Sequence, residues 1–329
     1  MDDKNDFFDV AAVGELLIDF TPAGHDLNGD QLFAQKPGGA PANVLAAACK
    51  LGGKTAFIGK VGNDMFGRFL CKTLDGLKID TSGLVTDPVV PTTLAFVQLD
   101  ENGDRSFRFY RNPGADIMLR KSEIPQNIID RSHIFHFGSV SLTSEPSRSA
   151  TIAAVKAAAE HGCIISYDPN YRPPLWNNVH EAKEQMLAGL KLSDIVKVSE
   201  EEMLLLTGET DLQRGSLKLG NSGASLVLVS LGAKGAFFRK NGLTGRIPTY
   251  DVKTIDTNGA GDAFLGAVLY CLRKCSLEEI RALSNTELTR LVSFANAAGA
   301  LATSKNGAIP SMPTLEEIES CRKNIPLLN

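Results

Sequence analysis

The chain alternates between short β-rich runs and amphipathic helical segments, with Gly or Pro between them, and this alternation constrains the fold more than any other feature. Some of the β-rich runs, such as residues 225–230, are apolar at almost every position. Continuous apolar strands of this kind suit a sheet that helices cover on both faces. The sequence therefore predicts an α/β fold with a mostly parallel central sheet flanked by helices.

The expected elements follow from these two patterns. Strands are predicted at residues 10–18, 55–59, 133–137, 163–167, 195–198 and 226–230. Helices are predicted at residues 42–51, 66–77, 147–161, 179–190, 261–273, 287–303 and 315–322.

Two stretches interrupt the alternation. Residues 19–37 have no helical pattern and are rich in turn formers, and residues 89–112 contain two expected strands, 92–99 and 106–110, around residues 101–104. Asn102-Gly103 between such runs is a strong hairpin signal. We interpret both stretches as excursions from one domain, residues 1–329, that form a small β-sheet lid able to exclude water from a site. The alternative is an edge hairpin without a role in function.

Composition excludes several classes of protein. The chain has 34 Lys plus Arg and 38 Asp plus Glu, a formal net charge of −4, which disfavours a nucleic-acid or polybasic membrane surface. No apolar run approaches the roughly 20 residues that span a bilayer, and the acidic start lacks a secretory or transit pattern, so we expect a cytoplasmic protein. The six dispersed cysteines indicate buried thiols rather than disulfides or a zinc site.

The most informative motif is Asp256-Thr257-Asn258-Gly259-Ala260-Gly261-Asp262-Ala263-Phe264. A glycine-rich turn before an apolar helix lets backbone N–H groups converge on an anion. Asp262 would lie in the first helical turn, where a carboxylate can serve the helix dipole or act as a base for an alcohol. No Lys-Ser or Lys-Thr follows the glycines, so this is not a Walker A loop.

The second motif is Pro37-Gly38-Gly39-Ala40-Pro41-Ala42-Asn43, which lies just before a predicted helix. The paired glycines Gly38 and Gly39 allow a ligand to approach closely. The Asn43 amide can both donate to and accept from hydroxyl groups. An ordinary loop-to-helix entry explains the same residues, and this segment alone does not separate the two interpretations.

Together the two motifs resemble the signatures of the ribokinase-like pfkB family of carbohydrate kinases, in the same order and about 220 residues apart. The resemblance extends over nearly the whole chain, through residues 14–19, 231–235, 294–298 and 306–308. It implies a ribokinase-like fold. Residues 167–176 and 107–116 resemble the fructokinase form of the family, so the implied activity is ATP-dependent phosphorylation of D-fructose to fructose 6-phosphate.

The resemblance implies a role for each matching residue. Asp262 would take the proton of the sugar 6-hydroxyl, and Gly259, Ala260 and Gly261 would bind the γ-phosphoryl group through their N–H groups. The sugar would be held by Asp19, Gly38, Gly39, Asn43, Arg111, Asp168 and Arg172. For several of these a structural role stays open: Asp19 as a turn residue, Asp168 as a cap of the Pro-rich loop, and the two arginines as surface ion-pair partners.

The nucleotide would contact Ser199, Gly232, Lys234, Gly235 and Asn296. The family's Asn-x-x-Glu motif corresponds to residues 199–202, where Glu202 is retained and Ser199 replaces the Asn. Glu202 would order water on the Mg²⁺ that accompanies ATP, or simply be part of a charged helix N-terminus. Asp256 and Asn258, with residues 303–311, match a monovalent cation site of some members, which adds K⁺ as an expected ion.

Other interpretations remain open at this point. A 2-keto-3-deoxygluconate kinase or another hexose kinase shares part of the pattern. Because Ser199 departs from the motif, a catalytically silent kinase-like partner protein is a further alternative. A dinucleotide-binding oxidoreductase is disfavoured because no G-x-G-x-x-G turn follows the first strand. Sugar and ATP are the expected partners, with a homodimer formed through the β lid.

Overall fold

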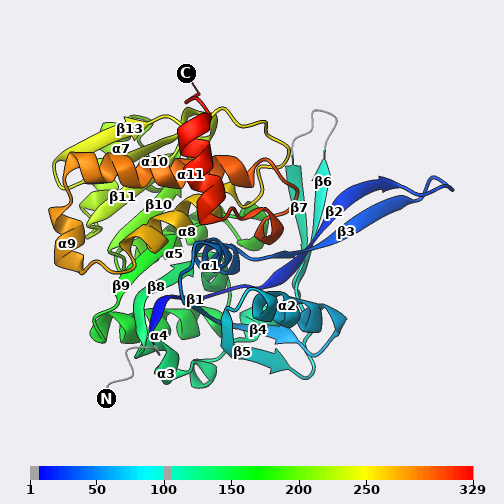
Figure 1. Ribbon diagram of the computed structural model, residues 1–329. Helices are drawn as coiled ribbons and strands as arrows, with labels where there is room; N and C mark the ends of the chain where they lie inside the picture. Colours follow the sequence, from blue (N-terminus) through cyan, green and yellow to red (C-terminus); the bar gives the residue numbers. More distant parts are fainter. Residues whose placement is uncertain (1–6, 100–104, 329) are drawn as a thin grey trace, which may run out of the picture.

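The computed structural model describes residues 7–99 and 105–328 (Figure 1), so the predicted turn at residues 101–104 lies outside the described residues. A nine-stranded sheet forms the centre, in the order β13-β12-β11-β10-β9-β8-β1-β4-β5. Its strands are β1 (Phe8–Val13), β4 (Thr55–Gly62), β5 (Asp80–Asp87), β8 (Ser132–Gly138), β9 (Ile164–Asp168), β10 (Ile195–Ser199), β11 (Leu226–Ser230), β12 (Ala236–Lys240) and β13 (Leu243–Ile247). All neighbours from β11 to β5 pair in parallel, and β12 and β13 add an antiparallel edge.

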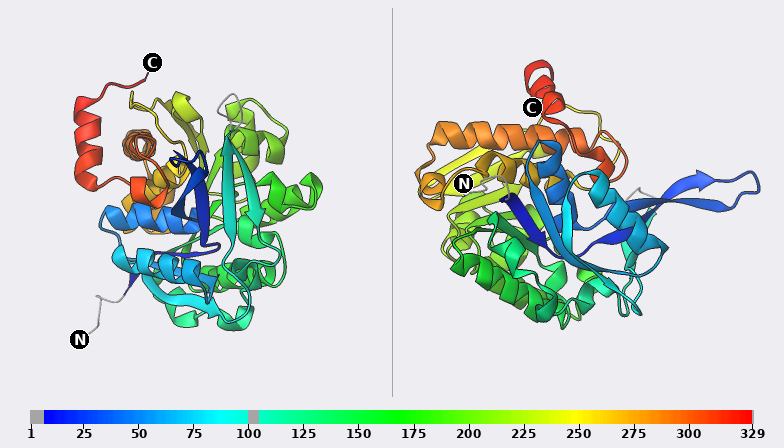
Figure 2. Two further views of the ribbon diagram at one scale, coloured as in Figure 1. Left: turned by 90° about the vertical axis from the view of Figure 1, so that its right-hand side faces the viewer. Right: turned by 60° about the horizontal axis from the view of Figure 1, so that its bottom comes forward.

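Helices cover both faces of this sheet, as the apolar strands predict (Figures 1 and 2). One face is covered by α1 (Ala40–Lys50), α2 (Met65–Gly76), α8 (Ala260–Leu272), α9 (Leu277–Ala282), α10 (Asn285–Ala302) and α11 (Leu315–Asn324). The other is covered by α3 (Gln126–Ile129), α4 (Ser147–Glu160), α5 (Val179–Leu190), α6 (Glu200–Thr207) and α7 (Leu212–Gly220). No helix in the described ranges is long and apolar enough to cross a membrane.

The strands supply both apolar cores by alternation. In β1, Val10 and Ala12 belong to the core under α1 and α8, whereas Ala11 and Val13 belong to the core under α4. Successive side chains of a strand point to opposite faces, so a strand with no polar face must be covered on both sides. The burial of these four residues explains the continuous apolar runs.

A second, four-stranded sheet stands beside the main sheet in the order β3-β2-β6-β7. Its strands are β2 (Leu17–His25), β3 (Gln31–Gly38), β6 (Leu94–Leu99) and β7 (Arg105–Tyr110). The expected small β-sheet is therefore present, and its β2–β3 hairpin projects from the molecule (Figure 1). Stacked and edge-on aromatic contacts join Phe20, Phe33 and Phe96 within it.

The sequence-based prediction was wrong at residues 10–18, where one strand was expected. β1 ends at Val13 and β2 begins at Leu17 in the other sheet. The chain changes sheets at Gly14, whose Cα faces the Pro41 ring, and at Glu15, whose carboxylate accepts the Ala40 N–H at 2.9 Å. An apolar run alone does not reveal this bend, because its partners lie more than twenty residues away in α1.

Other differences are omissions. The prediction did not include β5, β12, β13, α3, α6, α7 or α9. The helices and strands that it did include begin and end within about two residues of the observed ones, apart from the bend above and the end of β4, which lies at Gly62 rather than at the predicted residue 59.

Candidate active site

The second glycine motif forms the entry from β3 into α1. Gly38 packs directly over the Asp19 carboxylate, where any side chain would collide. Gly39 has φ of 118° and lies against the Glu15 carbonyl, so only glycine fits this conformation without strain. These two glycines bring the backbone close to the Asp19 and Glu15 side chains, and Asn43 follows in the first turn of α1.

The first glycine motif forms the N-terminus of α8. Gly259 is the N-cap in a left-handed conformation, with φ of 78°, and packs on Ala308. The Ala260 N–H donates to the Thr257 carbonyl at 3.3 Å, and the first helical hydrogen bond runs from Ala263 to Gly259. The Gly261 and Asp262 N–H groups consequently have no intrahelical acceptor, which makes them suitable donors to an anion.

Asn43 and Asp262 meet in one buried contact. Asn43 Nδ2 donates to Asp262 Oδ2 at 2.8 Å. Burial raises the pKa of Asp262 to about 6; Asp168 adds to this, whereas Lys197 and the Asn43 hydrogen bond oppose it. A carboxyl group with a pKa just below neutral is ionised at neutral pH yet still a useful base.

Asp19 lies in the same pocket, on β2. Burial raises its pKa to about 6, Arg172 and the Asn258 side chain lower it, and the nearby carboxylates Asp262 and Asp256 raise it. Several carboxylates thus share one buried site. Such a site accepts many hydrogen bonds, and it suits a neutral ligand that carries several hydroxyl donors.

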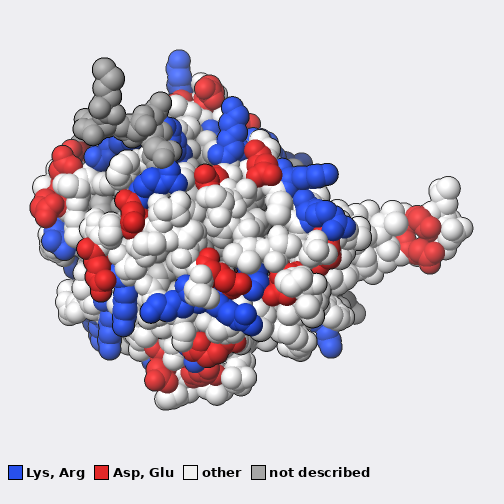
Figure 3. All heavy atoms as spheres, turned by 90° about the horizontal axis from the view of Figure 1, so that it is seen from below, with Lys and Arg blue, Asp and Glu red and all other residues white. Residues whose placement is uncertain are grey.

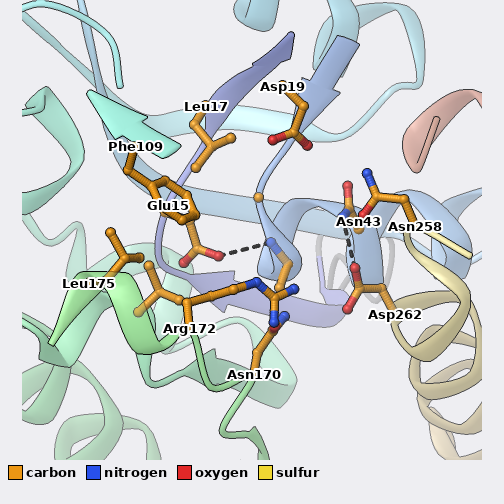
Figure 4. A pocket seen from close by; sticks show the side chains of 13 residues that line it. Glu15, Leu17, Asp19, Asn43, Phe109, Asn170, Arg172, Leu175, Asn258 and Asp262 are labelled. Carbon is orange, nitrogen blue, oxygen red and sulfur yellow. Dashed lines mark hydrogen bonds between the residues drawn. The ribbon is translucent and has the colours of Figure 1, made fainter. Parts of the chain in front are cut away.

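The pocket takes its lining from both sheets and from α1 and α8 (Figure 4). Asn43, Asn258 and Asp262 lie on one side, and Phe109, Leu175 and Glu15 lie on the other. The full lining is Glu15, Leu17, Asp19, Gly39, Ala40, Asn43, Phe109, Val140, Asn170, Arg172, Leu175, Asn258 and Asp262. Phe109 comes from β7, so the small sheet forms one wall of the pocket, as a lid would.

Lys197 is a buried cation behind the α8 N-terminus. Its Nζ pairs with Asp168 Oδ2 at 2.8 Å and lies 2.8 Å from the position that a Cβ on Gly261 would take. Burial opposes the charge of Lys197, but Asp168 and Glu202 outweigh this effect and raise its pKa. Positive charge is therefore fixed next to the anion-binding turn.

The structure places three of the expected sugar ligands, Gly38, Arg111 and Asp168, outside the pocket lining. Arg111 is buried, and its Nε and Nη2 both donate to Asp116 Oδ2, while its Nη1 donates to the Thr143 hydroxyl. Asp168 accepts from Lys197 and from the Asn170 N–H, so it caps the Pro-rich loop. Arg172, in contrast, lines the pocket, and its charge lowers the pKa values of Asp19 and Asp262.

Ser199 and Glu202 form a capping box at the start of α6. Glu202 N–H donates to the Ser199 hydroxyl, and Glu202 Oε2 accepts the Ser199 N–H at 2.7 Å. Glu202 Oε1 accepts the Tyr171 N–H, also at 2.7 Å. The Ser that replaces the family's Asn is thus a good N-cap. Both carboxylate oxygens of Glu202 already accept hydrogen bonds from backbone N–H groups.

The residues expected to bind nucleotide lie around the end of β11. Gly232 and Lys234 are in a short 3₁₀ turn after this strand, and the exposed Lys234 is 3.9 Å from Glu200. Gly235 packs so closely on the Ile247 carbonyl that no side chain fits. Asn296 donates from Nδ2 to the Ile247 and Pro248 carbonyls, a contact that holds α10 to the end of β13.

Asp256 joins the turn before α8 to the loop after α10. Its two oxygens accept the Asn258 N–H at 2.7 Å and the Gly307 N–H at 2.9 Å. Within the described part of the chain, no three or more His, Cys, Asp or Glu side chains group as a metal site.

Sequence reasoning missed Glu15 and Lys197. Lys197 carried a signal, because a single Lys interrupts an otherwise apolar predicted strand, and a buried charge needs partners. Glu15 carried the same signal, as the single charge in the apolar run at residues 10–18, but that run was interpreted as one strand. Asn170, Phe109 and Leu175 also line the pocket without having been predicted.

Comparison with known proteins agrees with this geometry. Residues 8–315 match the model of the pfkB family of carbohydrate kinases, and the chain belongs to this family. It is 44% identical to fructokinase-1 of Oryza sativa subsp. japonica over 94% of this chain and 96% of the rice protein. It is 42% identical to probable fructokinase-4 of Arabidopsis thaliana over 95% and 96% of the two chains.

Solved structures give the same result. A fructokinase from Xylella fastidiosa with bound ATP superposes with a TM-score of 0.89 at 35% identity, over 96% of this chain and 98% of that one. A fructokinase from Vibrio cholerae O395 with fructose, ADP and calcium superposes with a TM-score of 0.85 at 37% identity, over 95% and 98%. The expected ribokinase-like fold is confirmed.

Proposed function

We propose that this protein is an ATP-dependent fructokinase in which Asp262 is the general base. The activity agrees with the fructokinases that it resembles across nearly its whole length. The position of Asp262 supports its role as the base. Its carboxylate is buried in the first turn of α8, lines the pocket and lies beside N–H groups that have no intrahelical acceptors.

The reaction follows from this arrangement. The 6-hydroxyl oxygen of fructose forms a bond to the γ-phosphorus of ATP, the bond from that phosphorus to the β–γ bridging oxygen breaks, and ADP leaves. Asp262 takes the hydroxyl proton. The Gly261 and Asp262 N–H groups, in the turn begun by Gly259 and Ala260, stabilise the charge on the transferred group, and Lys197 adds a fixed positive charge nearby.

Sugar binding is supported by the excess of acceptor atoms. Asp19 and Asp262 are buried carboxylates, and Asn43 Oδ1 is a buried oxygen with no hydrogen-bond partner among the described residues. Each can accept from a sugar hydroxyl. Gly38 and Gly39 let the sugar approach the backbone, and Arg172 contributes a cation at the wall.

The ions remain part of the proposal. Mg²⁺ would enter with ATP and neutralise its phosphate charge, and Glu202 would order one of its waters with the lone pairs that backbone N–H groups leave available. K⁺ would lie near Asp256 and Asn258, because Asp256 brings the turn and the residue 303–311 loop together. Replacing K⁺ with tetramethylammonium should then lower activity. The nucleotide would contact Ser199, Gly232, Lys234, Gly235 and Asn296.

A homodimer through the lid is also proposed. The projecting β2–β3 hairpin exposes Leu27, Leu32 and Phe33 (Figure 2). The face in Figure 3 carries charges of both signs on the main body of the molecule. Asp26 and Asp30 lie in the turn between β2 and β3. Sedimentation of the chain and of a Leu27→Lys variant would test this association.

The cytoplasmic location stays a prediction. One relative, probable fructokinase-6 of Arabidopsis thaliana, is named chloroplastic.

The decisive assay is ADP release with ATP and Mg²⁺ across fructose, glucose, mannose, ribose and 2-keto-3-deoxygluconate. Turnover with fructose that disappears in Asp262→Asn supports both the reaction and the base. Preference for another acceptor keeps the base and changes the substrate. No turnover with any sugar favours the silent partner protein.

A further inference from the structure

We propose that Glu15 determines which acceptors this kinase uses. Its carboxylate binds a hydroxyl group at the end of the acceptor remote from the phosphorylated one, and it excludes acceptors that carry a carboxylate at that end. The inference rests on the proposed sugar kinase function and adds a residue that selects the acceptor.

The geometry at the bend between β1 and β2 leaves one oxygen of Glu15 for a ligand. Oε1 accepts the Ala40 N–H at 2.9 Å, which holds the side chain at the α1 entry. Oε2 is buried and has no hydrogen-bond partner of normal geometry among the described residues. The residue is 4% exposed and lines the pocket, so a ligand there would meet this oxygen.

A hydroxyl donor is the natural partner of this oxygen. A buried carboxylate oxygen without a donor is costly, and a hydroxyl group that donates to it removes that cost. Phe109 and Leu175 lie on the same side of the pocket (Figure 4) and give apolar surface for the carbon face of a sugar. Asp262 lies on the opposite side, so Glu15 faces the part of the acceptor that is not phosphorylated.

The same carboxylate opposes an anionic acceptor. Behind Glu15 lies the buried Arg111–Asp116 pair, in which Arg111 favours the charge of Glu15 and Asp116 opposes it. Burial raises the pKa of Glu15 to about 7, so the site already resists one negative charge. A second carboxylate in the same pocket would be repelled. Neutral sugars are therefore favoured over sugar acids, even though Arg172 also lines the pocket.

The test is Glu15→Gln, which keeps an oxygen for the Ala40 N–H but removes the charge. Steady-state rates would be measured with D-fructose and with 2-keto-3-deoxygluconate at saturating ATP and Mg²⁺ and at about pH 8, above the pKa of Glu15, so that the wild-type side chain is ionised. We expect KM for fructose to rise about tenfold, the lower end for a hydrogen bond to a charged group. We expect the ratio of kcat/KM for fructose to that for the acid to fall at least tenfold.

Two further variants separate charge from contact. Glu15→Asp keeps the charge but shortens the side chain, so fructose should bind more weakly while the acid stays excluded. Asp194→Asn is the matched control, because Asp194 also accepts a backbone N–H, that of Ile165 at 2.9 Å, but lies outside the pocket lining. In this control the ratio between the two acceptors should not change. Melting temperatures of all variants report on folding.

Unchanged KM for fructose and an unchanged acceptor ratio in folded Glu15→Gln would overturn the inference and leave Glu15 as a support for Ala40. If the wild-type protein does not phosphorylate fructose, the proposed function fails instead. In that case calorimetric titration of fructose into wild-type and Glu15→Gln protein still tests the inference, because equal affinities would overturn it.

Discussion

Asn43 Nδ2 donates a 2.8 Å hydrogen bond to Asp262 Oδ2, although 219 residues separate the two in the chain. The bond joins the first turn of α1 to the first turn of α8, and so joins the two glycine motifs of the family. It holds the proposed base in position and favours its ionised form against burial. We therefore expect the charges around this contact to affect both the activity and the stability of the protein.

Replacing Asp262 with Asn should abolish most turnover without much effect on sugar affinity. The amide keeps the size of the side chain but does not take a proton, and general-base catalysis contributes about 100- to 10,000-fold. We expect kcat to fall about 1,000-fold or more and the dissociation constant for fructose to change only a few-fold. Single-turnover rates and calorimetric titration would measure these, and near-normal turnover would contradict the assignment.

Activity should decline as the pH falls through about 6. The pKa of Asp262 is raised to about 6, so below that pH the base is protonated. The pH dependence of kcat/KM would show this limb. In Asn43→Ala the donor that favours ionisation is lost, so the limb should move to higher pH; a limb that stays in place would show that another group titrates.

Asp262→Asn should also make the protein more stable at alkaline pH. The pKa of Asp262 in the folded protein lies above its value of about 3.8 in the unfolded chain. The protonated side chain therefore stabilises the fold fully below pH 3.8, and this stabilisation is lost as the pH rises through about 6. A rise in pKa from 3.8 to about 6 corresponds to a free energy of about 3 kcal/mol. We expect the variant to exceed the wild type by about 1–3 kcal/mol in free energy of unfolding at pH 8.

Urea unfolding at pH 8 and at pH 5 would measure this difference, which should shrink at the lower pH as Asp262 takes up its proton. Equal stability of the two proteins at pH 8 would mean that the folded protein does not disfavour the charge of Asp262.

Lys197→Met should impair both folding stability and the base. Removing one partner of a buried ion pair leaves Asp168 unpaired and costs about 3–5 kcal/mol. The loss of positive charge should also raise the pKa of Asp262, so the acid limb of the rate should move upward. The double variant Lys197→Met with Asp168→Asn should recover stability and bring the acid limb back towards its original pH, because Asp168 raises the pKa of Asp262 and Lys197 lowers it. A limb that stays at high pH in the double variant would show that Lys197 does not act on the base through its charge.

Local patterns accounted for much of the fold. The helices at α5 and α4 and the strand at β11 begin where the sequence predicts them, because periodicity and turn residues act over a few positions. One available signal was not used: Asn241-Gly242 lies between β12 and β13, and Asn241 has φ of 52°, as a tight hairpin turn requires.

The sequence alone determined the chemistry of the two glycine motifs. The left-handed Gly259, the first-turn position of Asp262 and the close approach at Gly38 and Gly39 follow from residue types that are neighbours in the chain. Only the tertiary structure decided which other side chains surround them. It placed Glu15 and Lys197 at the site, and it paired Arg111 with Asp116 away from the pocket lining. Contacts between segments that are distant in the sequence set these positions, and burial together with the charge of Asp168 raises the pKa of Asp262. A local sequence pattern does not predict such contacts.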